Sequence, residues 1–209
     1  MASRAGEVYE NPVTGEHAVV IEGDDENRDA RMVVELTVAP GGAVAGEHSH
    51  SYIHETFEVL EGEVGFSLNG ERSVGGPGTK VEIPIEAVHD WWNAGEGKAR
   101  VIVTIDPVGR FDEMIRTLFG LARDGKTNEK GMPNLLQLAV FAKEFRPEME
   151  LTKPPKAIQS VLFGILSPIG KALGYRATYP EYDAPHGRVE VPEDLRHRSP
   201  AKAESTSAG

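Results

Sequence analysis

The sequence contains no cysteine among its 209 residues. Disulfide bonds and thiolate-ligated zinc are therefore excluded, so nitrogen and oxygen atoms must hold any metal. No apolar run approaches the roughly 20 residues that a membrane-spanning helix needs. The opening residues, MASRAGEVYE, lack the apolar core of a secretory signal. We therefore expect a cytoplasmic protein.

Basic residues are scarce. Lys and Arg together number 22 against 33 Asp and Glu, which gives a net charge of -11 and a pI near 5.1. Phosphate backbones and anionic membrane surfaces attract proteins that have a net or local basic face. We therefore expect neither a nucleic acid nor a membrane as a partner, and a small molecule as the substrate.

Short alternating apolar runs, separated by glycine, fill residues 17–106. The runs RMVVELTV, EVGFSLNG and ARVIVTI place apolar side chains at every second position, as in half-buried strands. The second run ends on Asn69-Gly70, a strong hairpin signal. Several short strands at this spacing predict a β-barrel or sandwich over residues 1–110.

After Pro107 the apolar period becomes helical. FDEMIRTLFGLARDG predicts an amphipathic helix that ends near Gly125. NLLQLAVFAKEF and KAIQSVLFGIL predict two more helices, and Pro168 is expected to break or bend the last one. These helices form an extension over residues 111–185. The polar composition of residues 186–209 predicts a disordered tail.

Ligand-type side chains gather in the stretch GAVAGEHSHSYIHETFEVLEG, residues 42–62. Side chains two apart on a strand share a face, so His48 and His50 project together and make half a metal site. Glu55 lies an odd number of residues beyond His50, and the intervening SYIH supplies the bend that would bring it to the same point. His89 is the fourth candidate, on another strand.

The spacing of this stretch resembles the first motif of the cupin superfamily: Gly, five residues, His-x-His, three or four residues, Glu, six residues, Gly. All of these positions match, from Gly42 to Gly62. The second cupin motif is matched by residues 78–93, with His89 in the histidine position and Glu86 where glycine is usual. Glycine often supplies positive φ at a tight turn, so the conformation at Glu86 is a point for the structure to decide.

The resemblance covers about residues 30–106 and implies a mainly β fold, a small double-stranded β-helix (jelly-roll) barrel. It also implies one divalent transition metal per chain, held by His48, His50, Glu55 and His89. Nitrogen and oxygen ligands of this kind suit Fe, Mn, Ni, Co or Zn and leave open positions for substrate or water. Two alternatives are a barrel that has lost its metal, and a Glu55 that orients a histidine without touching the metal. The family and the excess apolar helix surface also imply a homodimer.

Cupin barrels host dioxygenases, isomerases, epimerases, decarboxylases, lyases, storage proteins and ligand sensors, so the fold does not name the chemistry. Our first hypothesis is an oxygenase acting on a small, partly apolar molecule, with Glu55 as a catalytic base. Phe57, Phe66 and Trp91 would form the apolar wall of the substrate site, although Trp91 could equally be core filler. The alternatives are an isomerase, epimerase or lyase that uses the metal as a Lewis acid, and a non-catalytic binding or sensing module.

Two further placements follow from the pattern. His54, next to Glu55, should point to the opposite face of its strand. The apolar faces of the helices should pack on the outside of the barrel or in a dimer interface, and the alternatives are a lid over the barrel mouth and a groove for a lipophilic ligand.

Overall fold

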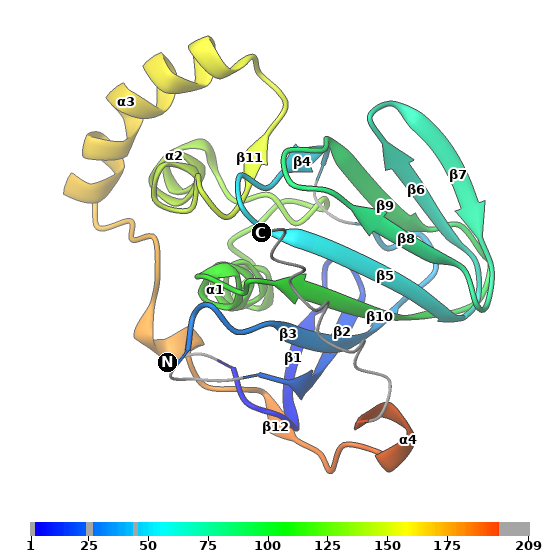
Figure 1. Ribbon diagram of the computed structural model, residues 1–209. Coiled ribbons are helices and arrows are strands. Elements are labelled where there is room, and N and C mark those ends of the chain that lie inside the picture. The colour runs from blue at the N-terminus through cyan, green and yellow to red at the C-terminus, as the bar shows by residue number, and fades with distance from the viewer. Residues whose placement is uncertain (1–2, 24–26, 44–45, 197–209) are drawn as a thin grey trace, which may run out of the picture.

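The computed structural model describes residues 3–23, 27–43 and 46–196. Its β part consists of two antiparallel sheets, with strand orders β12-β1-β2-β3-β10-β5-β8 and β11-β4-β9-β6-β7 (Figure 1). The strands are β1 (Glu7–Asn11), β2 (Glu16–Glu22), β3 (Met32–Val38), β4 (His48–Ser49), β5 (His54–Glu61), β6 (Val64–Leu68), β7 (Glu71–Gly75), β8 (Lys80–Ile83), β9 (His89–Asn93), β10 (Ala99–Asp106), β11 (Glu150–Leu151) and β12 (Gly187–Arg188). This jelly-roll arrangement confirms the expected fold class.

The alternating runs form strands as predicted. The first and third runs become β3 and β10, which pair antiparallel with Val101 opposite Leu36. Asn69 and Gly70 both have positive φ, at 50° and 87°, and they turn β6 into β7. Period-two side chains from both sheets meet in one apolar core between the sheets, where Val38, Val59 and Phe66 are buried.

The chain continues into α1 (Phe111–Arg123), α2 (Leu135–Glu144), α3 (Lys156–Ala172), the 3-10 turn η1 (Pro180–Tyr182) and α4 (Glu193–Arg196). The N-terminus of α2 is capped by Asn134, whose side-chain oxygen accepts hydrogen bonds from the backbone N–H groups of Leu136 and Gln137. Figure 1 shows α1 and α2 beside the open end of the β part, with α3 outside them at the edge of the molecule.

The expectation that the helices pack on the outside of the barrel is wrong for α1 and α2. Leu118 and Phe119 of α1 pack against the core between the sheets. Phe141 of α2 packs against Met114 of α1. An amphipathic pattern predicts that a helix face is buried but not what covers it, and here the apolar faces close the end of the barrel.

Pro168 does not end α3, which runs on to Ala172. Proline removes one backbone donor, but Phe163 before it and Gly170 after it both lie on the buried side of the helix. Gly170 comes so close to α2 that an added Cβ would lie 2.8 Å from a methyl carbon of Val140. Packing on α2 on both sides of the proline holds the helix together.

The predicted tail begins too early. Residues 187–196 form β12 and α4, and β12 pairs with β1. Val191 and Leu195 are buried against Ile21, Val33 and Ile102, which gives this polar segment an apolar anchor. Residues 197–209 lie outside the described part of the chain. Within the described part, none of the helices is long and apolar enough to cross a membrane.

Candidate metal centre

Four side chains with metal-ligating atoms meet at the helix-facing end of the barrel: His48, His50, Glu55 and His89. One ligand atom from each lies within 4.8 Å of all the others. They come from β4, the segment after it, β5 and β9, and His48 is directly opposite His89 in the β4–β9 pair. All four side chains are buried. Three imidazoles and a carboxylate in this arrangement form a site that is capable of binding a metal.

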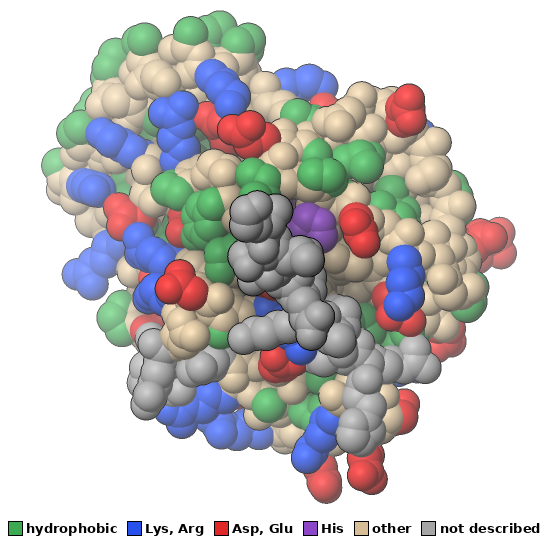
Figure 2. Space-filling view, in the orientation of Figure 1, with side chains coloured by type: hydrophobic (Ala, Val, Ile, Leu, Met, Phe, Trp, Pro, Cys, Tyr) green, Lys and Arg blue, Asp and Glu red, His purple; other side chains and the backbone are tan. Residues whose placement is uncertain are grey.

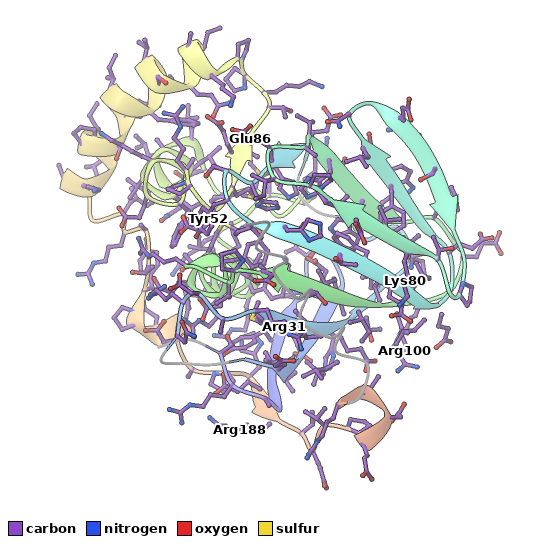
Figure 3. All side chains as sticks on the ribbon, in the orientation of Figure 1. Arg31, Tyr52, Lys80, Glu86, Arg100 and Arg188 are labelled. Atoms are coloured by element: carbon purple, nitrogen blue, oxygen red, sulfur yellow. The ribbon has the colours of Figure 1, made fainter. Side chains whose placement is uncertain are left out.

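Two local features bring these residues together. Residues 51–53 leave the strand conformation, so the odd spacing between His50 and Glu55 is absorbed by a bend, as predicted. In the turn before His89, Glu86 has a φ of 64°, the left-handed conformation that glycine adopts more easily. Its backbone N–H donates to the carbonyl of His50, at 2.8 Å. Figure 3 shows Glu86 on the side of the β part that faces the helices.

Backbone carbonyls fix the orientation of all three imidazoles. His48 Nδ1 donates to the carbonyl of Gly46 at 3.0 Å, and His89 Nδ1 donates to that of Ala87 at 3.1 Å. His50 Nδ1 donates to the carbonyl of Glu148. A carbonyl can only accept, so each Nδ1 must carry the proton and each Nε2 is turned toward the site. Such contacts commonly orient histidines that bind metals.

The charge state of the centre follows from its burial and from the contacts of Glu55. Burial and the neighbouring imidazoles lower the pKa of His48 to about 3, so His48 is neutral at pH 7. Burial acts to raise the pKa of Glu55, but the contacts with His50 and His89 outweigh it and hold that pKa below its usual range. Burial acts to lower the pKa of His50, but the charge of Glu55 outweighs it and raises that pKa.

The atoms around the Glu55 carboxylate are arranged so that a positive charge between them would be stabilised. Glu55 Oε2 lies 3.3 Å from His50 Nε2 and 3.1 Å from His89 Nε2. With Nδ1 protonated, a neutral imidazole presents a lone pair at Nε2, so lone pairs would face a carboxylate unless a cation lies between them. The buried His50 Nε2 has no hydrogen-bond partner among the described residues. A divalent metal ion or an added proton satisfies these atoms, and the four residues therefore fit the implied metal.

A cavity of about 150 Å³ opens from this centre toward the helices. His48 and Glu55 lie at one end of it, and most of its wall is apolar. The sheets contribute Met32, Leu36, Phe57, Trp91, Val103 and Ile105, and the helices contribute Phe111, Ile115, Leu118, Leu138 and Phe141. The centre thus faces an apolar chamber that the barrel and the helical extension share.

The predicted wall residues are placed differently from one another. Phe57 and Trp91 are buried and line the cavity. Phe66 is buried as well, but it lies outside the cavity lining and packs edge-on against Phe57, with ring centroids 5.6 Å apart. Its role is to support Phe57, because its own side chain is part of the core between the sheets. His54 is half-buried and takes no part in the ligand cluster.

The sequence interpretation missed the contribution of residues 147–152. The carbonyl of Glu148 orients His50, and the Glu148 side chain accepts a hydrogen bond from Tyr52 at 2.9 Å. Leu151, in β11, pairs with His48 in β4. Figure 3 shows Tyr52 between the β part and the helices. Backbone contacts and a two-residue strand leave no periodic signal, so only the fold reveals them.

Comparisons with known proteins agree with this geometry. A family model described as the cupin domain matches residues 34–105. Quercetin 2,3-dioxygenase from Bacillus subtilis (strain 168) is 27% identical over 106 residues, which cover 51% of this chain but only 31% of that relative.

Two solved structures show partial likeness. An RmlC-like cupin from Shewanella frigidimarina aligns with a TM-score of 0.42 and 20% identity, over 49% of this chain and 84% of the other. A sugar phosphate isomerase from a cupin superfamily, from Silicibacter pomeroyi, aligns with a TM-score of 0.39 and 18% identity, over 51% of this chain and 70% of the other. Residues 34–105, which carry the four clustered ligand-type side chains, therefore match the cupin domain.

Proposed function

We propose that this protein is a metal-dependent oxygenase that acts on a small apolar molecule with an enol, catechol or diketone group. The observation that carries the proposal is that the cluster of three histidines and Glu55 opens into a mainly apolar cavity. The similarity to quercetin 2,3-dioxygenase supports the reaction class, although it covers less than a third of that relative.

The size of the cavity narrows the substrate class. An apolar cavity of about 150 Å³ is large enough for a benzene-sized molecule. A flavonol with three rings would extend beyond this volume. We therefore propose a substrate that places one ring, or a short branched chain, against Phe57 and Trp91 and directs its oxygen atoms toward His48 and Glu55.

Different residues would bind the metal, hold the substrate and accept the proton. A bound metal would supply Lewis acidity and, if it is redox-active, electrons for reaction with O2. Phe57, Trp91 and Leu118 hold the apolar part of the substrate and keep water away from the centre. Glu55, ionised and buried beside two imidazoles, is the group placed to accept a proton from an enol or phenol hydroxyl.

Oxygen uptake by metal-loaded protein tests the proposal. The protein is purified without added metal, analysed for metal content, and assayed with monocyclic catechols, enols and β-diketones, with quercetin included as a large substrate. We expect uptake with a small substrate and Fe, Mn, Ni or Co, and none with quercetin. Turnover with zinc and without O2 would move the assignment to an isomerase or lyase. Binding without turnover would make the protein a sensing module.

Glu55→Gln separates two roles of the carboxylate. If Glu55 is the base, we expect the variant to keep most of its metal and to lose on the order of a hundredfold in kcat. If the variant loses its metal instead, the main role of Glu55 is that of a ligand. His54→Gln is the matched control, because this neighbouring side chain is outside the cluster.

A further inference from the structure

Glu148 has a buried side chain with a single partner. The residue is 4% exposed, and its Oε1 accepts a hydrogen bond from the Tyr52 hydroxyl at 2.9 Å. The other carboxyl oxygen, Oε2, is buried and has no partner within the described part of the chain. Figure 2 shows Lys and Arg side chains on the outer surface of the helical part, but none of the described ones forms an ion pair with Glu148. One hydroxyl group therefore supplies the only hydrogen bond that the described residues give to this carboxyl group.

The backbone of the same residue contacts the metal centre. The carbonyl of Glu148 accepts the Nδ1 proton of His50, which turns Nε2 of that histidine toward the site. Ser51 Oγ donates to the carbonyl of Pro147 at 2.6 Å. Three consecutive residues, 50–52, thus all donate to residues 147–148. Since Glu148 carries the acceptors for both Tyr52 and His50, a shift of its side chain would also displace the carbonyl that orients His50.

The Tyr52 hydroxyl is held on its other side by the main chain before α1. A Cβ added to Gly109 would overlap the hydroxyl oxygen, so the two are in direct contact. Gly109 is itself fixed, because its N–H donates to the carbonyl of Arg28 and its carbonyl accepts from the Arg28 guanidinium, both at 2.9 Å. The hydroxyl therefore lies between a fixed piece of main chain and the Glu148 carboxyl, consistent with the position of Tyr52 between the β part and the helices in Figure 3.

We propose that Tyr52 is a positioning residue of the metal centre: by holding the Glu148 carboxyl, it fixes the carbonyl that orients His50. The inference rests on the proposed metal centre and not on the reaction that takes place there. Without the hydroxyl, the buried carboxyl would have no partner among the described residues, and an unsatisfied group of this kind is driven to move toward water. Groups behind metal ligands commonly contribute about 10- to 100-fold to metal affinity.

Tyr52→Phe removes only the hydroxyl and tests the proposal in the full-length chain. The affinity for Co(II) is measured by competition with a chromophoric chelator, and the visible spectrum of the cobalt-loaded protein is recorded. We expect the affinity to fall on the order of tenfold. The absorption bands should shift, because a displaced His50 changes the geometry of the ligands.

Tyr9→Phe is the matched control. The Tyr9 hydroxyl donates to the buried carboxyl of Glu7, also at 2.9 Å, and Glu7 does not belong to the ligand cluster. This variant loses the same kind of hydrogen bond, so its stability should fall while its cobalt affinity and spectrum stay unchanged. Circular dichroism shows whether both variants are folded.

A second pair of variants displaces the hydroxyl without removing it. Gly109→Ala adds a Cβ where the Tyr52 hydroxyl lies, at a φ of 54° that also strains the backbone of alanine. Gly125→Ala is its control, because a φ of 67° causes the same strain while the added Cβ would meet no heavy atom within 4 Å. Both should lower the stability, but only Gly109→Ala should lower the cobalt affinity and alter the spectrum.

Proton NMR of the metal-free protein tests the contact without any metal. The Nδ1 proton of His50, identified by its loss in His50→Ala, should exchange slowly with water in the wild type and in Tyr9→Phe. In Tyr52→Phe it should exchange severalfold faster, because the carbonyl that accepts it is no longer fixed.

Two results would overturn the proposal. One is the same affinity, spectrum and proton exchange in Tyr52→Phe as in the wild type. The other is an equal change in Tyr9→Phe, which would show a general effect on the fold. A wild type that binds no metal would instead contradict the proposed function, and the exchange of the His50 proton would then decide the positioning role alone.

Discussion

At the scale of single residues, the ability of the cluster to hold a metal depends on which nitrogen of each histidine is free. Carbonyls of Gly46, Glu148 and Ala87 occupy the three Nδ1 atoms, and each Nε2 is left for the site. Three backbone carbonyls, from residues that are not themselves in the cluster, therefore hold the imidazoles in an orientation that suits metal binding. Replacing a histidine removes a ligand without disturbing these carbonyls.

We expect His48→Ala with His50→Ala to abolish metal binding, because two of the four clustered side chains are lost. The affinity should fall by at least about a hundredfold, since even partners of the ligands are commonly worth 10- to 100-fold. His54→Ala is the control, because it removes a nearby histidine outside the cluster. Elemental analysis of the purified proteins provides the measurement, and equal metal content in all of them would contradict the assignment of the site.

Glu86→Gly should raise the free energy of unfolding or leave it unchanged. A side chain in the left-handed region costs roughly 1–2 kcal/mol, which glycine does not incur, although glycine also makes the unfolded chain more flexible. Glu96→Gly, at an exposed loop position without positive φ, should lower the stability. Urea denaturation measures the free energy of unfolding of both variants. If Glu86→Gly lowered it as much as Glu96→Gly does, the result would argue against the turn geometry.

Glu16 lines the cavity and should make the stability depend on pH. Burial raises its pKa to about 7, and a hydrogen bond from Thr14 opposes this only in part. The unfolded chain releases this proton near pH 4.3, so the folded state loses stability as the pH rises from about 4.3 to 7. Glu16→Gln should therefore be more stable than the wild type at pH 8, on the order of 2 kcal/mol, and similar to it at pH 4. Denaturation midpoints at the two pH values test this, and a constant difference would contradict it.

At the scale of elements, α1 is both a wall of the cavity and a part of the core. Leu118→Trp should fill part of the cavity and weaken binding of a monocyclic phenol about tenfold or more, while the metal content stays the same. Arg123→Trp adds the same ring at an exposed position of the same helix and should have no effect. Titration followed by NMR measures both, and unchanged affinity in Leu118→Trp would place the phenol elsewhere.

The sequence was sufficient to predict most helices and strands, but not which surfaces they pack against. Period-two runs predicted β3, β6 and β10, and helical periodicity predicted α1 and α2 within a few residues. The two histidine motifs predicted the cluster because their spacing places each side chain at one end of the barrel. Periodicity could not show that Leu118 lines the cavity, because it identifies a buried face and not the surface that covers it. Phe66 and Trp91 both occupy inward-facing positions of alternating strands. Only the structure shows that Trp91 lines the cavity, whereas Phe66 packs behind Phe57.

At the scale of the whole molecule, a bound metal should stabilise the entire fold. It would connect β4, β5 and β9 through their clustered side chains, and a ligand that binds only the folded state contributes about 2.7 kcal/mol at a concentration a hundred times its Kd. Removal with a chelator should therefore lower the melting temperature by roughly 5–10 °C. The double variant without His48 and His50 should not respond to the chelator. Calorimetry measures both, and an equal response would show that the chelator acts elsewhere.

The segment between α2 and α3 also gives the molecule a mechanical connection. Thr152 N–H donates to the carbonyl of Glu47 at 3.1 Å, and Ser51 N–H donates to that of Pro147 at 3.3 Å, on either side of His48 and His50. These bonds join main chain to main chain, so they transmit displacement more rigidly than side chains do. A pull on the N-terminal end of α3 would reach both histidines within a few residues. A displacement of the segment that precedes α3 would therefore pass through main-chain bonds to the residues on either side of His48 and His50.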